Sequence, residues 1–349
     1  MNAVDLEAVI DKLLLSQENN SDGYKFKLLS TGKNQFVFDE ALRQICRCRG
    51  DRKTYECSGD KAEVIAEVLY IVRGLLRGDC ILTTRGVYYR KTIFKSQRQV
   101  DEALISISLM LGVTRSSLHV FGSSRGLIIG PVFLIGPEFR IDCQNCGIIG
   151  TIVPIESGII SDIQLKPGVD KISFILVMEK ETAFTELACL KFPKKYNCII
   201  ITARGMPDLA TRALLSKLQK LFDVPIFAVV DPNPSGLEIY CTYKYGSKRM
   251  AHDNLGYSVP RLRWAGIYPS HLHAIIDKGH HMKLTTADIK IAKRLLKKEY
   301  VTEDDHLKGE LLFMLQNNVK GEIECTSSIA TDFIMHFVGN MIEELMTSS

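Results

Sequence analysis

The chain has 349 residues, of which 46% are apolar and 24% charged, a composition typical of a soluble protein with a sizeable core. Its length predicts two domains. No apolar run reaches the ~18–20 residues that a membrane helix needs, and the acidic N-terminus lacks the features of a signal peptide. We therefore expect an intracellular, soluble protein with no membrane partner.

Charge is unevenly distributed along the chain. The formal net charge is +4, but residues 41–100 contain thirteen Lys or Arg and only six Asp or Glu. A basic segment suits a partner with a phosphate backbone, although a solvated basic surface would have the same composition.

The ten cysteines are scattered, and most lie in apolar or helical stretches, which predicts reduced, buried thiols. Cys143 and Cys146 have the spacing of metal ligands. A zinc site needs four ligands and no second pair follows, so we interpret this segment as a turn.

The first half of the chain predicts mainly helices. Residues 4–15 have apolar positions at helical spacing, but we assign no chemistry to the first 40 residues. Three further helices are predicted at 61–76, from about 83, and at 98–111, followed by β-prone runs at 117–121 and 126–134. Three helices and a β-hairpin outline a winged helix.

From residue 171 the pattern changes to apolar strands that alternate with helices. Strands are predicted at 172–178, 197–202 and 224–230, and helices at 181–190, 208–221 and 235–245. Strands without polar alternation indicate a parallel sheet covered on both faces. Ligands collect at the carboxyl ends of such strands, where Glu179 and Asp231 lie. Three more helices are predicted at 286–298, 305–317 and 329–345.

The segment TTRGVYY at 83–89 contains a candidate nucleophile, Tyr89. A tyrosine phenol has a pKa of about 10 and attacks poorly unless its proton is removed or transition-state charge is stabilised. Arg85 lies one helical turn before Tyr89, where its guanidinium could hold a phosphate oxygen. Tyr88 points elsewhere on a helix and is expected to pack. A Tyr-Tyr pair is, however, more often part of a core or interface.

Two acidic positions predict a metal site. Glu179 and Asp231 would hold Mg²⁺, which prefers carboxylate oxygens, and the ion would orient a scissile phosphate. Asn233 offers only a neutral carbonyl and would be a weaker ligand. Alternatively, Glu179 caps a helix or forms an ion pair, and Lys180 is either a phosphate contact or a solvated side chain.

The nucleophile and the acids fall in different predicted domains. A symmetric dimer would solve this separation if the tyrosine of one chain reached the metal pocket of the other, and two such sites would cut two strands.

These motifs, in this order, resemble the family of topoisomerase VI A subunits and eukaryotic meiotic double-strand-break proteins. The resemblance extends over about residues 60–330 and includes further segments. These segments are LGVTRSSLH at 111–119, SRGL at 124–127, ITARGMPDLATR at 201–212, IYCTYKYGS at 239–247 and VPRLRWAGI at 259–267.

The resemblance implies a mixed α/β fold. Residues 51–150 would form a winged-helix, CAP-like domain that carries the catalytic tyrosine. Residues 165–349 would form a Toprim metal-binding domain with C-terminal helices, and residues 1–50 would be an extension of unknown role. Tyr89 would become joined to a DNA 5′ end, with Arg85 as its helper.

The resemblance also implies roles for the acids and shows two departures. Glu179 matches the Toprim glutamate, and Asp231 matches the first acid of an Asp-x-Asp pair. Asn233 replaces the second acid, which puts two-metal binding in doubt. Gly86 stands where the family usually has an acidic residue.

The implied activity is DNA double-strand cleavage that initiates meiotic recombination, with Mg²⁺ as cofactor, in the nucleus on chromosomes. Implied partners are double-stranded DNA, a second copy or a paralogue, an ATPase of the B type, and meiotic accessory proteins. Expected DNA contacts are Arg125, Lys180, Arg115, Arg90 and Lys91. Two alternatives stay open: a topoisomerase VI A subunit that reseals DNA, and a catalytically silent DNA-binding scaffold.

Overall fold

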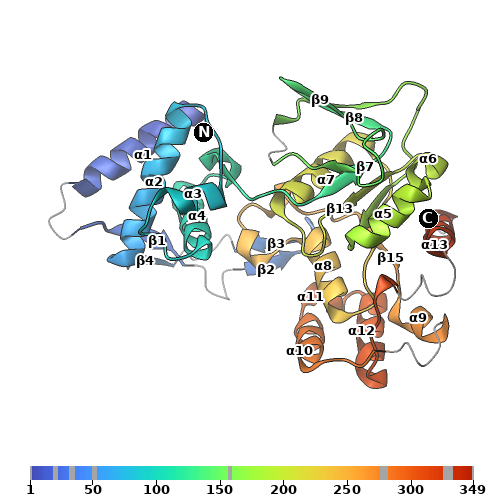
Figure 1. Cartoon of the computed structure of the whole chain (residues 1–349). Helices are drawn as coiled ribbons and strands as arrows, with labels where there is room; N and C mark the ends of the chain where they lie inside the picture. The colour runs from blue at the N-terminus through green and yellow to red at the C-terminus, as the bar shows by residue number, and fades with distance from the viewer. Residues whose placement is uncertain are drawn as a thin grey trace. The chain divides into compact units, whose positions relative to one another are not determined.

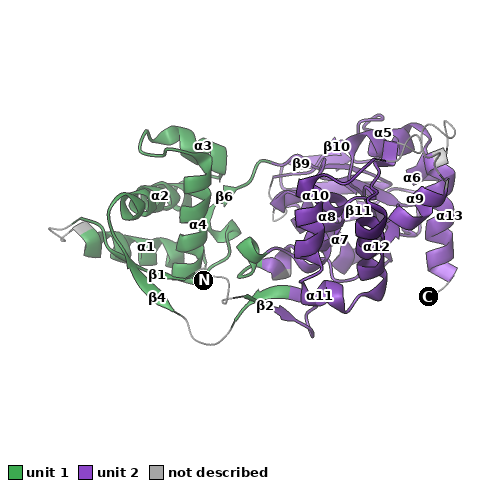
Figure 2. Cartoon of the chain, turned by 90° about the horizontal axis from the view of Figure 1, so that it is seen from below, with its two compact units in different colours: residues 1–37, 45–123, 248–253 green, residues 38–44, 124–247, 254–349 purple. Residues whose placement is uncertain are grey.

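The computed structural model describes residues 2–18, 23–30, 36–48, 53–155, 159–275, 282–324 and 333–347. The chain forms two compact units, coloured in Figure 2. Unit 1 consists of residues 1–37, 45–123 and 248–253, and unit 2 consists of residues 38–44, 124–247 and 254–349.

Unit 1 is mainly helical (Figure 1). Its helices are α1 (Ala3–Glu18), α2 (Asp60–Arg77), α3 (Thr84–Arg90) and α4 (Gln97–Leu111), with 3-10 turns η2 (Ser116–Leu118) and η4 (Lys248–Met250). Its strand pairs are β1 (Phe26–Leu29) antiparallel to β4 (Thr54–Cys57) and β5 (Leu82–Thr83) parallel to β6 (Val120–Phe121). Strands β2 (Phe36–Asp39) and β3 (Gln44–Arg47) pair with each other.

The N-terminal helix α1 belongs to the core of unit 1. Its side chains Leu6, Ile10 and Leu14 are buried in the same apolar cluster as the α2 stripe. Arg73 also forms an ion pair with Asp11 at 3.1 Å. The amphipathic pattern of this segment therefore reflects packing against α2.

The predicted hairpin between 117–121 and 126–134 is wrong. Strand β6 pairs with β5, whereas β7 (Leu127–Ile129) pairs with a strand of unit 2. All three β7 residues are buried, which requires cover on both faces and does not suit an exposed wing. The structure therefore assigns residues 124–150 to unit 2, earlier than the predicted boundary at 150. The three predicted helices α2, α3 and α4 are confirmed, and the winged-helix assignment stays a prediction.

Unit 2 is built on a six-stranded sheet in the order β10-β7-β13-β12-β14-β15. The bounds are β10 (Thr151–Ile152), β13 (Ile199–Thr202), β12 (Ile175–Met178), β14 (Ile226–Val229) and β15 (Leu262–Gly266). Strands β13, β12, β14 and β15 are mutually parallel, and β7 and β10 are antiparallel additions at one edge. The predicted α/β class with a parallel sheet is confirmed.

Helices cover the sheet, as the unbroken apolar strands require. Leu176 and Met178 of β12 share a core cluster with Phe184 of α5 (Glu181–Cys189) and Val338 of α13 (Phe333–Thr347). The alternate residues of β12 are equally buried, so its opposite face is covered too. Helices α7 (Leu209–Phe222) and α8 (Pro234–Tyr245) pack against β13 and β15 respectively.

The remaining elements of unit 2 surround this sheet (Figure 1). They are β8 (Val132–Gly136), β9 (Phe139–Asp142), β11 (Asp162–Leu165), α6 (Phe192–Tyr196), η5 (Asn254–Gly256), α9 (Pro269–Ile275), α10 (Thr286–Leu295), α11 (Glu299–Thr302) and α12 (Asp305–Asn317). The helix predicted at 305–317 is confirmed, the one at 286–298 ends at Leu295, and residues 329–332 lie outside the described residues. Among the helices described, none combines the length and apolar character needed to span a bilayer.

Candidate functional site

Two buried carboxylates lie at the carboxyl edge of the parallel sheet. Strands β12 and β14 are neighbours with Met178 opposite Val229, so the residues after them emerge side by side. Glu179 follows β12 directly, and Asp231 comes two residues after β14. The backbone N–H of Asp231 donates to Glu179 Oε2 at 2.7 Å, and Glu179 is 7% exposed and Asp231 4% exposed. The structure thus brings the two predicted acids together.

Burial makes ionisation of this pair costly. Desolvation, with the adjacent Asp231 adding repulsion, raises the pKa of Glu179 from 4.5 to about 7. Desolvation also raises the pKa of Asp231. Two carboxylates in a poorly hydrated place disfavour a double negative charge, and a cation between them would remove that penalty. The donor set fits a hard divalent ion that prefers oxygen ligands.

The close approach of helix α8 to the acids requires a glycine. A Cβ atom at Gly236 would lie 2.3 Å from the carbonyl oxygen of Asp231 and 3.0 Å from Glu179 Oε2. The sequence Asn-Pro-Ser-Gly at 233–236 therefore lets the first turn of the helix touch the acidic pair.

Asn233 is the N-cap of α8. Its Oδ1 accepts a hydrogen bond from the backbone N–H of Gly236 at 2.9 Å. Its Nδ2 donates to the carbonyl of Gly321 at 3.3 Å and lies 3.5 Å from Asp231 Oδ2. Because its amide oxygen already caps the helix, this arrangement makes Asn233 a poorer metal ligand than the carboxylates.

The segment 321–324, for which the sequence predicted no role, also contributes to the site. The N–H of Gly321 donates to the carbonyl of Pro232 at 3.0 Å, and the N–H of Ile323 donates to Asp231 Oδ1 at 2.9 Å. These bonds bring Glu322 and Glu324 to the acidic pair. Two glutamates at alternate positions after α12 do not by themselves indicate a site, so the local sequence held no signal for this contribution.

Lys180 lies among the carboxylates rather than in solvent. Its Nζ is 3.3 Å from Asp231 Oδ2, 3.2 Å from Glu322 Oε2 and 2.5 Å from Glu324 Oε2. Burial opposes its charge, but the bond to Glu324 and the charge of Asp231 outweigh burial and raise its pKa. Its expected role as a DNA contact stays a prediction.

The segment 201–212 supports the site through the backbone. The N–H of Gly205 and the hydroxyl of Thr202 both donate to the carbonyl of Glu179, at 2.9 and 3.2 Å. Arg212 is fully buried and donates to the carbonyl of Tyr257 at 2.8 Å, and desolvation lowers its pKa to about 10. This arginine holds the 254–257 turn against α7.

The candidate nucleophile lies on α3 in unit 1. Tyr89 is 68% exposed, and Arg85 Nη2 lies 3.4 Å from its hydroxyl oxygen. Tyr88 packs against the core of unit 1, as expected. Thr83 caps the helix by accepting a bond from the N–H of Gly86 at 3.0 Å. The helix therefore presents one tyrosine and its arginine outward.

The other predicted DNA contacts differ in accessibility. Arg115 is only 5% exposed, and its Nη2 donates to Thr84 Oγ1 at 2.8 Å and to Asp101 at 2.6 Å. It ties the start of α3 to α4, which is a structural role. Arg90 is exposed, and Lys91 is half-exposed and pairs with Glu67 at 3.0 Å. In unit 2, the exposed Arg125 donates to the carbonyl of Met206 at 3.0 Å.

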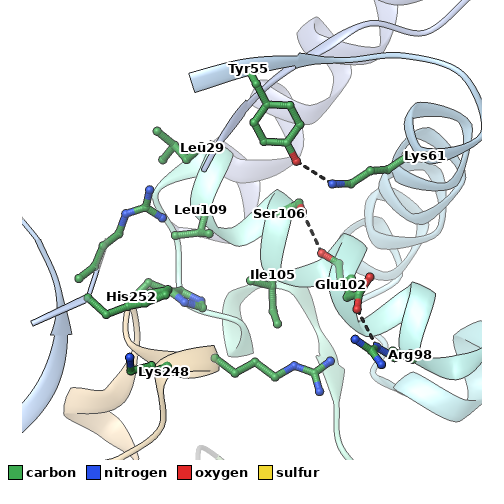
Figure 3. Close-up of a pocket in the computed structure, with 13 residues that line it drawn as sticks. Leu29, Tyr55, Lys61, Arg98, Glu102, Ile105, Ser106, Leu109, Lys248 and His252 are labelled. Carbon is green, nitrogen blue, oxygen red and sulfur yellow. Dashed lines mark hydrogen bonds and ion pairs between the residues drawn. The ribbon is translucent and has the colours of Figure 1, made fainter. Parts of the chain in front are cut away.

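Unit 1 also contains a basic pocket of about 530 Å³ (Figure 3). Its apolar lining includes Leu29 and Ile105. Its basic lining residues are Arg47, Lys61, Arg98, Lys248 and Arg249. Three of these come from the basic segment 41–100, so part of that charge is gathered in one hollow.

A second acidic group lies in unit 2 away from the pair. Glu40, Glu299 and Glu303 are exposed, and their carboxylates lie within 4.8 Å of one another. Exposed acids commonly approach one another without an ion. The buried pair is therefore the better candidate for a metal centre.

Replacement of Gly236 by Ala should destabilise unit 2. The new methyl group would overlap backbone and carboxylate atoms, and such overpacking costs about 1–3 kcal/mol. Chemical denaturation of the full chain measures the loss. Gly309→Ala in α12 is the matched control, because a Cβ there meets nothing within 4 Å, and this variant should be at least as stable as the parent. Equal effects of the two variants would contradict the close-contact explanation.

Gly86 occupies the third position of α3, where an acidic side chain would complete a capping box with Thr83. Gly86→Glu should therefore stabilise the protein by about 1 kcal/mol, through helix propensity and the added bond. Thermal unfolding checks this expectation. Gly86→Ala separates the two contributions, and a Glu variant no more stable than the Ala variant would rule out the capping bond.

Comparisons with known proteins match both halves of the chain. The family model for the Toprim domain shared by Spo11 and the A subunit of topoisomerase 6 matches residues 174–340. The model "Type IIB DNA topoisomerase" matches residues 60–120. The Toprim match contains both buried acids and the 321–324 segment. The second match contains Arg85 and Tyr89.

Curated relatives are similar over most of their length. The chain is 35% identical to the A3 subunit of DNA topoisomerase 6 from Oryza sativa subsp. indica, over 89% of this chain and 71% of the relative. It is 33% identical to meiotic recombination protein SPO11 of Mus musculus, over 94% of this chain and 84% of the relative. The A subunit of DNA topoisomerase 6 from Arabidopsis thaliana is 31% identical, over 90% and 73%.

Proposed function

Because the chain belongs to the family of topoisomerase VI A subunits and Spo11 proteins, we propose that it makes the DNA double-strand breaks that start meiotic recombination. At a coarser level it is a topoisomerase-like enzyme that cleaves DNA. The observation that carries the proposal is the outward-facing Tyr89, with Arg85 at its hydroxyl, on a helix within the type IIB match.

The proposed reaction is a transesterification. The phenol oxygen of Tyr89 attacks a backbone phosphorus, and a tyrosine–phosphate ester forms at the DNA 5′ end. The bond from phosphorus to the 3′ oxygen breaks, that oxygen leaves as a hydroxyl, and the phenol proton passes to solvent. Arg85 binds a non-bridging phosphate oxygen and stabilises the charge that builds up on it.

Glu179 and Asp231 would hold the metal, which we propose to be Mg²⁺ because their oxygens are hard ligands. When bound, the ion would orient the phosphate and neutralise its charge. The chain's own contribution is the placement of these oxygens by β12 and β14 and their shielding from water.

Tyr89 belongs to unit 1 and the acids belong to unit 2. We propose that the active form is a homodimer, or a heterodimer with a paralogue, in which two tyrosines cut two strands of double-stranded DNA. We also propose a B-type partner subunit, meiotic accessory proteins and a nuclear, chromosome-bound location. Exposed Arg90, Lys91 and Arg125 would contact the DNA backbone, with unit 1 acting as the winged-helix domain.

The second candidate function is that of a topoisomerase VI A subunit, which reseals the DNA with an ATPase partner. The identities to topoisomerase relatives and to SPO11 relatives are nearly equal, at 35% and 33%, so identity does not separate the two. A supercoil relaxation assay with ATP and the ATPase partner would separate them. The third candidate, a silent scaffold, is favoured only by the departures at Asn233 and Gly86.

Tyr89→Phe should abolish covalent attachment to DNA, because the ring then lacks the attacking oxygen. The assay is a denaturing gel of DNA incubated with the protein, Mg²⁺ and a B-type subunit. Tyr88→Phe is the matched control and should retain the adduct, since Tyr88 packs against the core. An adduct that survives Tyr89→Phe would exclude this residue as the nucleophile, and parental protein that binds DNA as a dimer without any adduct would favour the scaffold.

Metal affinity should depend on pH through Glu179. Its raised pKa, about 7 instead of 4.5, means that a proton competes with the metal in mildly acidic solution. Mn²⁺ affinity should therefore increase as pH rises through about 7. Without metal, the protein should lose stability as the pH rises from about 4.5 to about 7, because the folded state disfavours the ionised form of Glu179.

Calorimetric titrations with Mn²⁺ on both sides of this pH measure the first effect, and thermal unfolding without metal measures the second. Glu179→Gln has no proton to release, so it should bind metal weakly with a flatter pH profile. A parental affinity that stays constant across this range would contradict the assignment.

A further inference from the structure

We propose that Glu322 supplies the metal-binding carboxylate that position 233 lacks, and that the ammonium group of Lys180 occupies this place when no metal is bound. The inference rests on the metal site proposed above and deepens it. It assigns a ligand role to a residue from a separate segment, 321–324, and makes Lys180 and the metal alternative occupants of one acidic cluster.

The backbone supports this placement of Glu322. Its two neighbours are bonded to the turn after β14: Gly321 to the carbonyl of Pro232, and Ile323 to the carboxylate of Asp231. Glu322 therefore cannot move far from Asp231 unless the turn itself moves. The two carboxylates already bind the same ammonium group, at 3.3 and 3.2 Å from its nitrogen.

Asn233 takes part in the same arrangement. Its Nδ2 donates to the carbonyl of Gly321 at 3.3 Å. The Asn233 side chain cannot serve as an anionic ligand, but this bond holds the segment that carries Glu322. An aspartate side chain at this position has no N–H to donate and would face that carbonyl with a negative charge. The replacement of the second acid by Asn233 is therefore compatible with the position of Glu322 near Asp231.

Lys180 is the evidence that the cluster accommodates a cation. Its ammonium group is bound at once by three carboxylates of unit 2, one after β14 and the others at positions 322 and 324. Three carboxylates contact this single ammonium group, so the cluster retains excess negative charge when they are ionised. A divalent ion would offset more of that charge than Lys180 does.

The two glutamates differ in how they are held. Glu324 also accepts a bond from Thr182 Oγ1 at 2.8 Å, which anchors it to α5. Glu322 is half-exposed and contacts Lys180 at a longer distance than Glu324 does. We therefore assign the metal to Glu322, while Glu324 retains the displaced Lys180.

The test measures Mn²⁺ binding to the full chain by the loss of the free-ion signal in electron paramagnetic resonance, with no DNA or activity involved. Glu322→Gln should weaken binding by at least about tenfold, as expected for a metal-site carboxylate. Glu299→Gln, in the exposed acidic group, is the matched control and should leave binding unchanged. Circular dichroism confirms that each variant is folded.

Two further variants test the exchange of roles. Asn233→Asp should restore part of the affinity in the Glu322→Gln background and should help less in the parental chain, because the parental site already has its acid. Lys180→Met should strengthen binding, since it removes the competing cation. Weaker binding by Lys180→Met, or no rescue by Asn233→Asp, would overturn the shared-site inference.

The outcomes separate this inference from the metal site itself. If Glu179→Gln and Asp231→Asn weaken Mn²⁺ binding while Glu322→Gln does not, the metal site stands and the role of Glu322 is overturned. If neither Glu179→Gln nor Asp231→Asn has an effect, the metal site proposed above fails, and this inference fails with it.

Discussion

Two carboxyl groups held side by side in a buried place, where ionisation of both is costly, constrain the structure around them in unit 2. Glu179 and Asp231 are adjacent because β12 and β14 are parallel neighbours, and neither carboxylate can move away without loss of the backbone bonds that hold it. Gly236 lets α8 approach them, and Lys180 offsets part of their charge. Gly236 and Lys180 therefore help to keep these two mutually repulsive groups together until a cation binds.

Much of unit 2 could be predicted from periodicity alone. Apolar strands without alternation indicated a sheet covered on both faces, and strand ends indicated which acids would meet. Glu322 and Glu324 could not be found in this way. Their approach to Asp231 depends on the path of a loop about ninety residues further along the chain, and no local pattern encodes that path.

The hairpin predicted for the winged helix was wrong because one local sequence pattern is compatible with two different structures. A short apolar run at 127–129 suits a wing strand and a central sheet strand equally well, and only pairing with β13 decides between them. Helical geometry did separate Tyr88 from Tyr89. Arg115 was among the expected DNA contacts, but it is buried against Asp101, and this burial follows from tertiary packing that the local sequence does not reveal.

Neither unit is continuous in the chain, and this affects how the protein is made. Unit 1 includes residues 248–253, which contribute Lys248 and His252 to its basic pocket. During synthesis on the ribosome, the tyrosine-bearing unit therefore stays incomplete until most of the central sheet of unit 2 has been translated. Domains commonly fold as units, from the N-terminus first. Here the chain order links the two units, so unit 1 cannot be completed until residues 124–247 of unit 2 have been synthesised.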